Sequence, residues 1–494
     1  MSNLEISHSG IGGQKVTEAD LNTFATDIFS LPKYETSYVR TDTTEINIPV
    51  LDQNGPYRAF IGGNPEQYIN LKDTKLIAKL KLVGPNDEEL PYVDHEVNVV
   101  PNIINSLFES IGVEINGCSI SGLAQEGYAY KAYLDNLLNN SPNNVDSQLI
   151  TRIMIKDSPK LEPEWKYINF PATCPFPHPK DKPGQNATAE EKKAFEEKEQ
   201  TYFKYHKYLL KQNEGFWTRQ KILSYTDKHE FNLITPVYMD FFEINNLFPP
   251  NISITLIFKR TPRDFYMMNK DEKHKNCKIK IISLSLQVSM VTLSENVRFE
   301  HEKKFNLSEK ANYNFSRCMV STNEYGVGLN DLSWDNCLTG ELPKQIFFFF
   351  VKTSSYYGTP TSSPFDFKNL DIAQVSVKLN NYNFPPSPLE IEKFTSRKAG
   401  PAYSMFLDNI GLGNTDNSCL VDLDSWVYGS TIFAFDLSPD KCNGFHLHEV
   451  KKGVLSLKIK VNTPLTDPHT LIVFSVYDKI LSIDKFKNVY LYNV

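Results

Sequence analysis

Residues 342–391 read LPKQIFFFFVKTSSYYGTPTSSPFDFKNLDIAQVSVKLNNYNFPPSPLEI. The run from Ile346 to Val351 predicts a strand with an apolar partner on each face, because it holds four consecutive phenylalanines. Apolar and polar residues alternate from Ile372 to Leu379, which predicts a second strand after a polar loop. This stretch therefore predicts the interior of a β-sandwich with long loops, and it indicates no catalysis.

Two aromatic residues, Phe365 and Phe367, lie near the end of that polar loop. We predict that they anchor the loop and fix how it projects from the sheet. The alternative is that they fill the core of their own domain. The sequence leaves both interpretations open.

The rest of the chain repeats this pattern of short strands. Clear strands are predicted at 74–83, 251–259 and 278–291, and a further one at 236–244. In the longest of them the apolar phase slips between Ile281 and Ile282, which predicts a β-bulge. Helices are predicted after Pro101, over about 125–138 and over about 400–410, with a turn at Asn116-Gly117.

The order of these segments predicts an all-β protein with minor helices, divided into two β domains. Residues 1–40 form an N-terminal arm with apolar residues at helical spacing, which packs on its own body or reaches a neighbouring subunit. Residues 41–294 form the first domain, and the charged segment SENVRFEHEKKF that begins at Ser294 is a short helical connector. Residues 295–494 form the second domain. Within the first domain, residues 156–215 are a surface insertion with a Pro-rich part and a helix ending near Gly215.

Bulk composition excludes several classes of protein. The net charge is -7 and no long basic tract occurs, so we expect no sequence-specific nucleic-acid binding. Seven scattered cysteines without a CxxC motif indicate reduced thiols made inside a cell. The N-terminus lacks the apolar core of a signal peptide, and no apolar run is long enough to span a membrane.

Motifs that carry chemistry are absent or weak. There is no phosphate-binding loop, GxSxG elbow or HExxH. Asp422 and Asp424 form a lone DxD, which is more typical of a solvated turn than of a metal site. Cys442, His446 and His448 are the one ligand-like cluster, but zinc needs a fourth group, so ordinary strand polarity is favoured. We therefore predict no catalytic, cofactor-binding or metal site, and no enzyme.

Several segments carry a family resemblance. They are SLFESIGVEINGCSIS at 106–121, YAYKAYLDNLL at 128–138, YINLKDTKLIAKLKLV at 68–83, NLITPVYMDFF at 232–242 and NISITLIFKRTPRDFYMM at 251–268, followed by the 342–391 stretch, GSTIFAFDLSPD at 429–440 and the strand-rich segment 453–484. In their order and spacing they resemble the major capsid proteins of Maverick/Polinton elements and of their viral relatives, the adintoviruses. The resemblance covers most of the chain except the 156–215 block, which departs from the family pattern.

The resemblance implies a double jelly roll, that is, two tandem eight-stranded antiparallel β-sandwiches. It implies homotrimers that act as pseudo-hexameric capsomers, contact neighbouring capsomers and a single jelly-roll penton protein, and tile an icosahedral shell around double-stranded DNA. The protein would then be a virion component made in the cytoplasm or nucleus of a host cell. Two alternatives are a host protein domesticated from such an element and a two-domain jelly-roll carbohydrate-binding protein. The last is disfavoured by only 4 tryptophans and by the lack of paired carboxylates.

Overall fold

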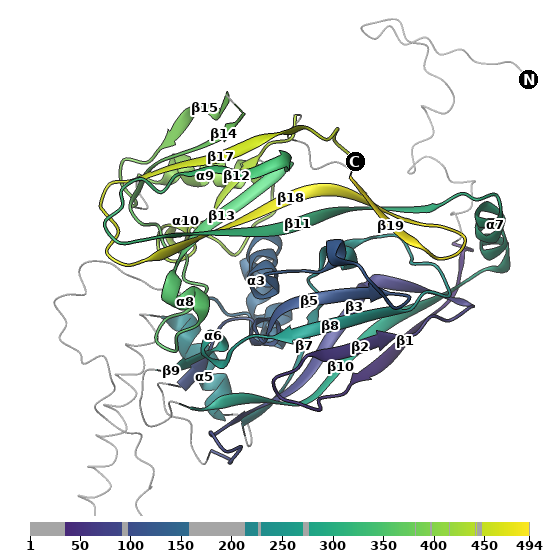
Figure 1. Ribbon diagram of the computed structural model, residues 1–494. Helices are drawn as coiled ribbons and strands as arrows, with labels where there is room; N and C mark the ends of the chain where they lie inside the picture. Colours follow the sequence, from purple (N-terminus) through teal and green to yellow (C-terminus); the bar gives the residue numbers. More distant parts are fainter. Residues whose placement is uncertain are drawn as a thin grey trace, which may run out of the picture.

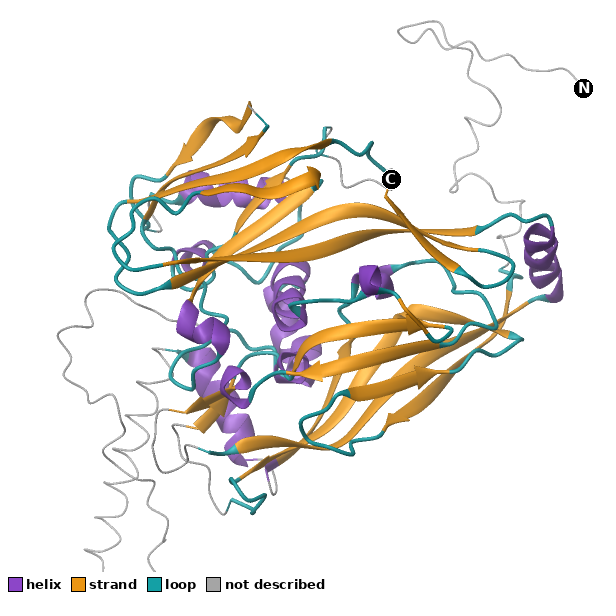
Figure 2. Ribbon diagram, viewed as in Figure 1, coloured by secondary structure: helices purple, strands orange, loops and turns teal. Residues whose placement is uncertain are grey.

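A computed structural model describes residues 35–90, 97–157, 213–225, 229–269, 276–380, 382–395, 398–413, 415–439, 441 and 447–493. These residues build two stacked β-structures with helices between and beside them (Figures 1 and 2). Of the predicted insertion, only its two ends are described, and most of the N-terminal arm also lies outside these residues. Within the described residues, no helix is both long and apolar enough to cross a membrane.

Eight strands of the first half pair into two antiparallel four-stranded sheets. In order across the sheets, the strands are β1 (Tyr38–Ile48), β10 (Lys278–Leu293), β3 (Gln67–Val83) and β7 (Glu230–Pro236), and then β2 (Tyr57–Ile61), β8 (Ile254–Arg260), β5 (Phe108–Ile115) and β6 (Cys118–Ser119). Counted along the chain, one sheet holds the first, eighth, third and sixth strands, and the other holds the second, seventh, fourth and fifth. Two extra strands, β4 (Val97–Val99) and β9 (Met267–Asn269), pair separately.

The second half has the same strand order. Its two sheets are β11 (Ala311–Tyr325), β18 (His469–Ile483), β13 (Gln345–Lys352) and β16 (Phe433–Asp436), and then β12 (Trp334–Glu341), β17 (Lys452–Val461), β14 (Ile372–Leu379) and β15 (Tyr382–Glu390). A final strand, β19 (Val489–Asn493), pairs with β18. Both halves therefore follow the connectivity of a jelly roll, and the predicted double jelly roll is confirmed.

Helices are short and sit at the ends of the sheets or between them (Figure 2). They are α2 (Ile103–Ser106), α3 (Tyr128–Asn139), α5 (Glu214–Tyr225), α6 (Arg263–Tyr266), α7 (Glu295–Asn306), α8 (Thr353–Tyr357), α9 (Gly400–Asn409) and α10 (Leu423–Val427). Single 3₁₀ turns occur at η1 (Ser121–Leu123), η2 (Pro142–Asn144), η4 (Ile150–Arg152) and η7 (Asp240–Glu243), and η3 (Val145–Leu149) is a π-helical turn. The predicted connector is α7, which links β10 to β11.

Several local predictions are confirmed and one is wrong. The register between β10 and β3 shifts between Ile281 and Ser283, so Ile282 is the bulged residue. The Asn116-Gly117 turn joins β5 to β6 with positive φ at both positions. The strand predicted at 236–244 does not form, because β7 ends at Pro236 and η7 follows. Proline lacks the N–H that a continuing strand would need.

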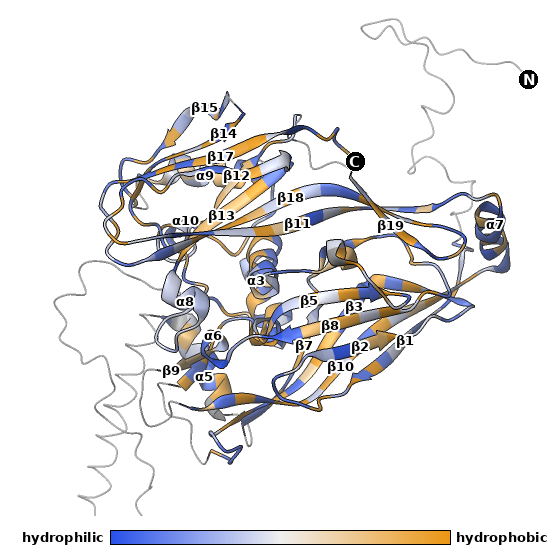
Figure 3. Ribbon diagram, in the orientation of Figure 1, coloured by the Kyte–Doolittle hydropathy of each residue, from blue (hydrophilic) through white to orange (hydrophobic). Residues whose placement is uncertain are grey.

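The four phenylalanines of β13 are buried, but only half of them face the sandwich interior. All residues from Ile346 to Val351 are buried, and Figure 3 shows the hydrophobic run along this strand. Side chains alternate along a strand, and the Phe349 ring lies 3.9 Å from Phe367 and 6.0 Å from Tyr130 of α3. Phe347 and Phe349 thus face the first half of the chain, and Phe348 and Phe350 face the other sheet of their own sandwich.

The hydrophobic core is continuous from one jelly roll to the other. A single cluster of buried side chains runs from Ile48 in β1 to Ile483 in β18. Every strand pair, in contrast, joins strands from the same half of the chain. The shared core favours one folding unit, whereas the separate sheets favour two domains. The division into domains at 294 therefore stays a prediction.

Candidate functional site at the junction of the two jelly rolls

Helix α3 lies between the two jelly rolls (Figure 1) and carries a buried polar cluster. Nine of its residues are buried, including Lys131 and Asn136. Ala129, Ala132 and Leu134 favour the helix, and Gly127, with φ of 60°, supplies the left-handed turn before it. Because the helix is covered on nearly all sides, its polar side chains must find partners inside the protein.

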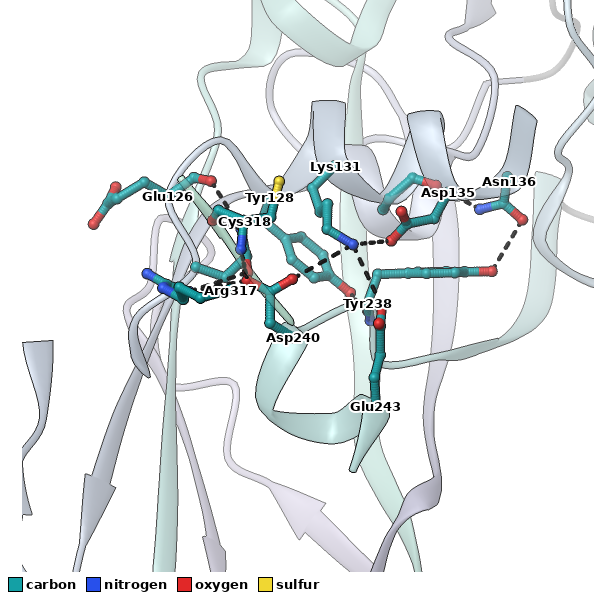
Figure 4. Close-up of polar contacts among 12 residues, drawn as sticks. Glu126, Tyr128, Lys131, Asp135, Asn136, Tyr238, Asp240, Glu243, Arg317 and Cys318 are labelled. Carbon is teal, nitrogen blue, oxygen red and sulfur yellow. Dashed lines mark hydrogen bonds and ion pairs between the residues drawn. The ribbon is translucent and has the colours of Figure 1, made fainter. Parts of the chain in front are cut away.

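Lys131 is surrounded by three carboxylates (Figure 4). Its Nζ lies 2.5 Å from Asp135 one turn further along α3, 3.6 Å from Asp240 and 3.4 Å from Glu243, the last two in η7. The Lys131 residue is only 6% exposed, so water does little to screen its pairs with Asp135 and Asp240, whereas the Glu243 side chain is 54% exposed. This contact fixes η7 against α3.

The second half reaches the same cluster through β11. The Arg317 guanidinium lies 3.2 Å from Asp240, and the backbone N–H of Cys318 donates a 2.6 Å hydrogen bond to the same carboxylate. Arg317 also donates to the carbonyl of Ala124, just before α3. Asp240 therefore binds a lysine of the first jelly roll and two donors of the second, which joins the halves through one carboxylate (Figure 4).

Negative charge exceeds positive charge by one in this cluster, since three carboxylates face Lys131 and Arg317. Burial raises the pKa of Asp135 to about 7, aided by the charge of Glu243 and opposed by Lys131. Burial also raises the pKa of Asp240. Burial by itself would lower the pKa of Lys131, but the three carboxylates outweigh it and raise this pKa well above the ordinary value. Lys131 therefore stays charged, and Asp135 is a carboxyl group of the cluster whose pKa lies near neutral pH.

An aromatic layer extends the junction beside the charges. The Tyr133 ring of α3 stacks on Phe365 with centroids 4.2 Å apart, and it meets Phe367 edge to face at 5.8 Å. Phe365 and Phe367 are 3% and 0% exposed. The two phenylalanines therefore pack between the halves of the chain and not only within their own domain, and their role as loop anchors stays a prediction.

This arrangement suits a structural joint, and neither its thiol nor its amine is a reactive nucleophile. Burial raises the pKa of the Cys318 thiol well above its ordinary value, so the thiol stays protonated. The charged Lys131 has no free electron pair for nucleophilic attack. Within the described part of the chain, no three His, Cys, Asp or Glu side chains are placed to hold a metal ion.

The candidates named from sequence lie elsewhere. Asp422 is the N-cap of α10 and accepts a 2.7 Å hydrogen bond from the backbone of Ser425, which explains that half of the DxD as a helix cap. His448 lies 3.7 Å from Asp478, while Cys442 and His446 fall outside the described residues. The junction cluster was not predicted, and its one sequence signal is the i, i+4 spacing of Lys131 and Asp135.

Comparison with known proteins supports the fold. No family model matches the chain. It is 20% identical over 469 residues to the uncharacterized protein F54H12.2 of Caenorhabditis elegans, covering 93% of this chain and 98% of the nematode protein.

Three solved structures have the same fold at very low sequence identity. They are PBCV-1 VP54 fitted into a reconstruction of the virophage Sputnik (TM-score 0.52, 9% identity, 94% of this chain and 99% of that chain), a quasi-atomic model of the PBCV-1 virus capsid (0.52, 8%, 94% and 99%) and the Sputnik virophage (0.54, 10%, 96% and 92%). These neighbours are double jelly-roll capsid proteins of large DNA viruses and virophages. The assignment to the Maverick/Polinton group stays a prediction.

Proposed function

We propose that this chain is a non-enzymatic major capsid protein. The observation that carries the proposal is the repeated strand order, with both halves closing into jelly rolls over nearly the full length of viral capsid structures. Several enzymes and binding proteins also use jelly rolls, so the fold alone does not assign the role. The junction adds support, because its charges and aromatic rings are placed to hold the two jelly rolls together.

The proposal extends to assembly. Three copies of a rigid two-jelly-roll unit present six similar sandwiches around one axis, which gives a pseudo-hexameric capsomer able to tile an icosahedral shell around double-stranded DNA. A rigid junction matters for this assembly. If a hinge separated residues 41–294 from 295–494, the angle between neighbouring capsomers would vary from one contact to the next. Neighbouring capsomers and a single jelly-roll penton protein would be its partners in the virion.

For lineage, we propose the Maverick/Polinton–adintovirus group. The quoted sequence segments support it, and so does a relative of nearly equal length in a nematode, as expected of an element resident in animal genomes. The same nematode relative favours a second candidate, a host protein domesticated from such an element. Particle formation by the recombinant protein distinguishes the two, because a domesticated protein need not form shells.

We also propose that the 156–215 block is an insertion on the first jelly roll. Its two described ends meet: Asn213 donates a 3.2 Å hydrogen bond to Asp157, and a Cβ on Gly215 would lie 1.8 Å from the carbonyl oxygen of Lys156. The chain therefore leaves and returns at one point, where only glycine fits. The block decorates the capsomer or clasps a trimer neighbour, and unchanged trimers and shells after deletion of 158–212 would rule out the clasp.

The mass of the purified protein tests the assembly proposal. A trimer of the 56.5 kDa chain has a mass of about 170 kDa, which native mass spectrometry resolves from a monomer or dimer. We expect the trimer at micromolar concentration, because obligate interfaces commonly bury more than ~2,000 Å². A monomer that persists at high concentration, and that forms no particles, would contradict the proposal.

A further inference from the structure

A groove of about 460 Å³ lies at the end of the molecule near α7, where both halves and the connector meet. Its lining includes Tyr38, Tyr68, Lys304, Phe305, Lys310 and Tyr313. The floor is fixed by hydrogen bonds, from Tyr313 to the carbonyl of Leu247 at 3.1 Å and between Tyr68 and His301 at 2.9 Å. Aromatic rings and two lysines thus line the groove, and one of these lysines, Lys310, donates a 2.9 Å hydrogen bond to Tyr492.

The apolar surface at this groove is incompletely covered by the described residues. Tyr68, Val291 and Leu293 form a small buried cluster of their own, separate from the main core. Helix α7 buries none of its 12 residues, and one of them, Phe305, lines the groove. A partly exposed aromatic ring beside a small satellite cluster is a surface suited to an apolar partner.

The N-terminal segment of the same chain begins at this surface. The backbone N–H of Ser294, the residue before α7, donates a 2.8 Å hydrogen bond to the carbonyl of Ser37. Tyr38, the first residue of β1, lines the groove itself. Leu31 is seven residues away in sequence, a span of up to ~24 Å for extended chain, so residues before it can reach the groove.

The chemistry of that segment complements the groove. Residues 17–31 read TEADLNTFATDIFSL, with three acidic residues and no basic one. Leu21, Phe24, Ile28 and Phe29 recur at the spacing of one helix face. The groove offers aromatic rings to such a face and two lysines, Lys304 and Lys310, against the single carboxylate of Glu309.

We propose that residues 17–31 dock in this groove of their own chain, with the apolar face on the satellite cluster and the acidic residues toward the two lysines. The short tether favours the chain's own segment over that of a second copy, since it holds the segment at a high effective concentration. The proposal does not depend on capsid assembly and can fail or hold independently of it.

Photo-crosslinking of the full-length chain tests this docking. A benzophenone amino acid replaces Phe24, and cross-linked peptides are mapped by mass spectrometry. We expect cross-links within one chain to residues 293–313. The double variant Lys304→Glu with Lys310→Glu should lower their yield roughly tenfold at low salt, because it turns two attractive pairs into repulsive ones.

Two further variants separate docking from misfolding. Lys452→Glu changes an exposed lysine of β17 away from the groove and should leave the yield unchanged. Adding Asp20→Lys and Asp27→Lys to the lysine-reversed protein should restore the cross-link. Cross-links scattered over the body, cross-links between two chains, or a yield insensitive to these charge changes would each overturn the proposal.

Discussion

The junction cluster yields a quantitative prediction for the variant Lys131→Met. Lys131 is one of two cations among three carboxylates, so its removal raises the excess of negative charge from one to two. Removing one partner of a buried ion pair commonly costs about 3–5 kcal/mol of unfolding free energy, because the remaining charge has neither water nor a partner. We expect a loss in this range at pH 8.

The loss should shrink as the pH falls. Without Lys131, Asp135 and Asp240 bind protons more tightly in the folded state than in the unfolded state, so acid stabilises the variant relative to the wild type. At pH 5 we therefore expect a clearly smaller difference than at pH 8. Adding Asp135→Asn to Lys131→Met returns the charge excess to one and should recover a large part of the stability.

Urea unfolding followed by tryptophan fluorescence measures these differences. The matched control is Lys458→Met, which removes a 2.6 Å ion pair with Asp335 whose side chains are 42% and 69% exposed. Such surface pairs contribute at most about 1 kcal/mol. A Lys131→Met protein as stable as this control at pH 8, or a loss that is independent of pH, would refute the account of the junction.

Three other predictions follow from named side chains. Burial raises the folded-state pKa of Asp135 to about 7 from 3.8, so its contribution to stability is full below pH 4 and is lost as the pH rises through 7. Asp135→Asn should therefore remove about 3 kcal/mol of the difference in unfolding free energy between pH 4 and pH 7. The double variant Phe365→Ala with Phe367→Ala should abolish soluble protein on expression, because removal of each buried ring costs about 3–5 kcal/mol of unfolding free energy. Soluble but unassembled protein would instead assign the two rings to an interface between copies of the chain. Cys118 is exposed, whereas burial raises the pKa of the Cys277 and Cys419 thiols. Cys118→Ser should therefore remove one equivalent of fast thiol labelling. An unchanged fast phase would count against the exposure of Cys118.

Strands with regular alternation were predictable from sequence, and the irregular ones were not. The segment 372–379 was expected as the structure has it, and so was the bulge at Ile282. β15 was not expected, because Pro385, Pro386 and Pro388 interrupt the segment; the sheet accommodates them because β15 is an edge strand. β12 was missed because none of its residues is buried and apolar residues do not alternate with polar ones along it.

The repeated strand order and the junction could not be obtained from local patterns. Pairing of the first strand with the eighth depends on contacts more than two hundred residues apart, such as Thr44 with Val288. The junction joins Lys131, Asp240 and Arg317, which belong to three distant segments, and each alone is typical of an exposed surface. Only the resemblance to a capsid family indicated that the two sandwiches belong together.

Electron microscopy of the purified full-length protein tests the central claim most directly. We expect trimers with a pseudo-hexagonal outline, six similar lobes around a threefold axis, and closed shells under assembly conditions. Monomers or dimers with no threefold particle at any concentration would contradict it.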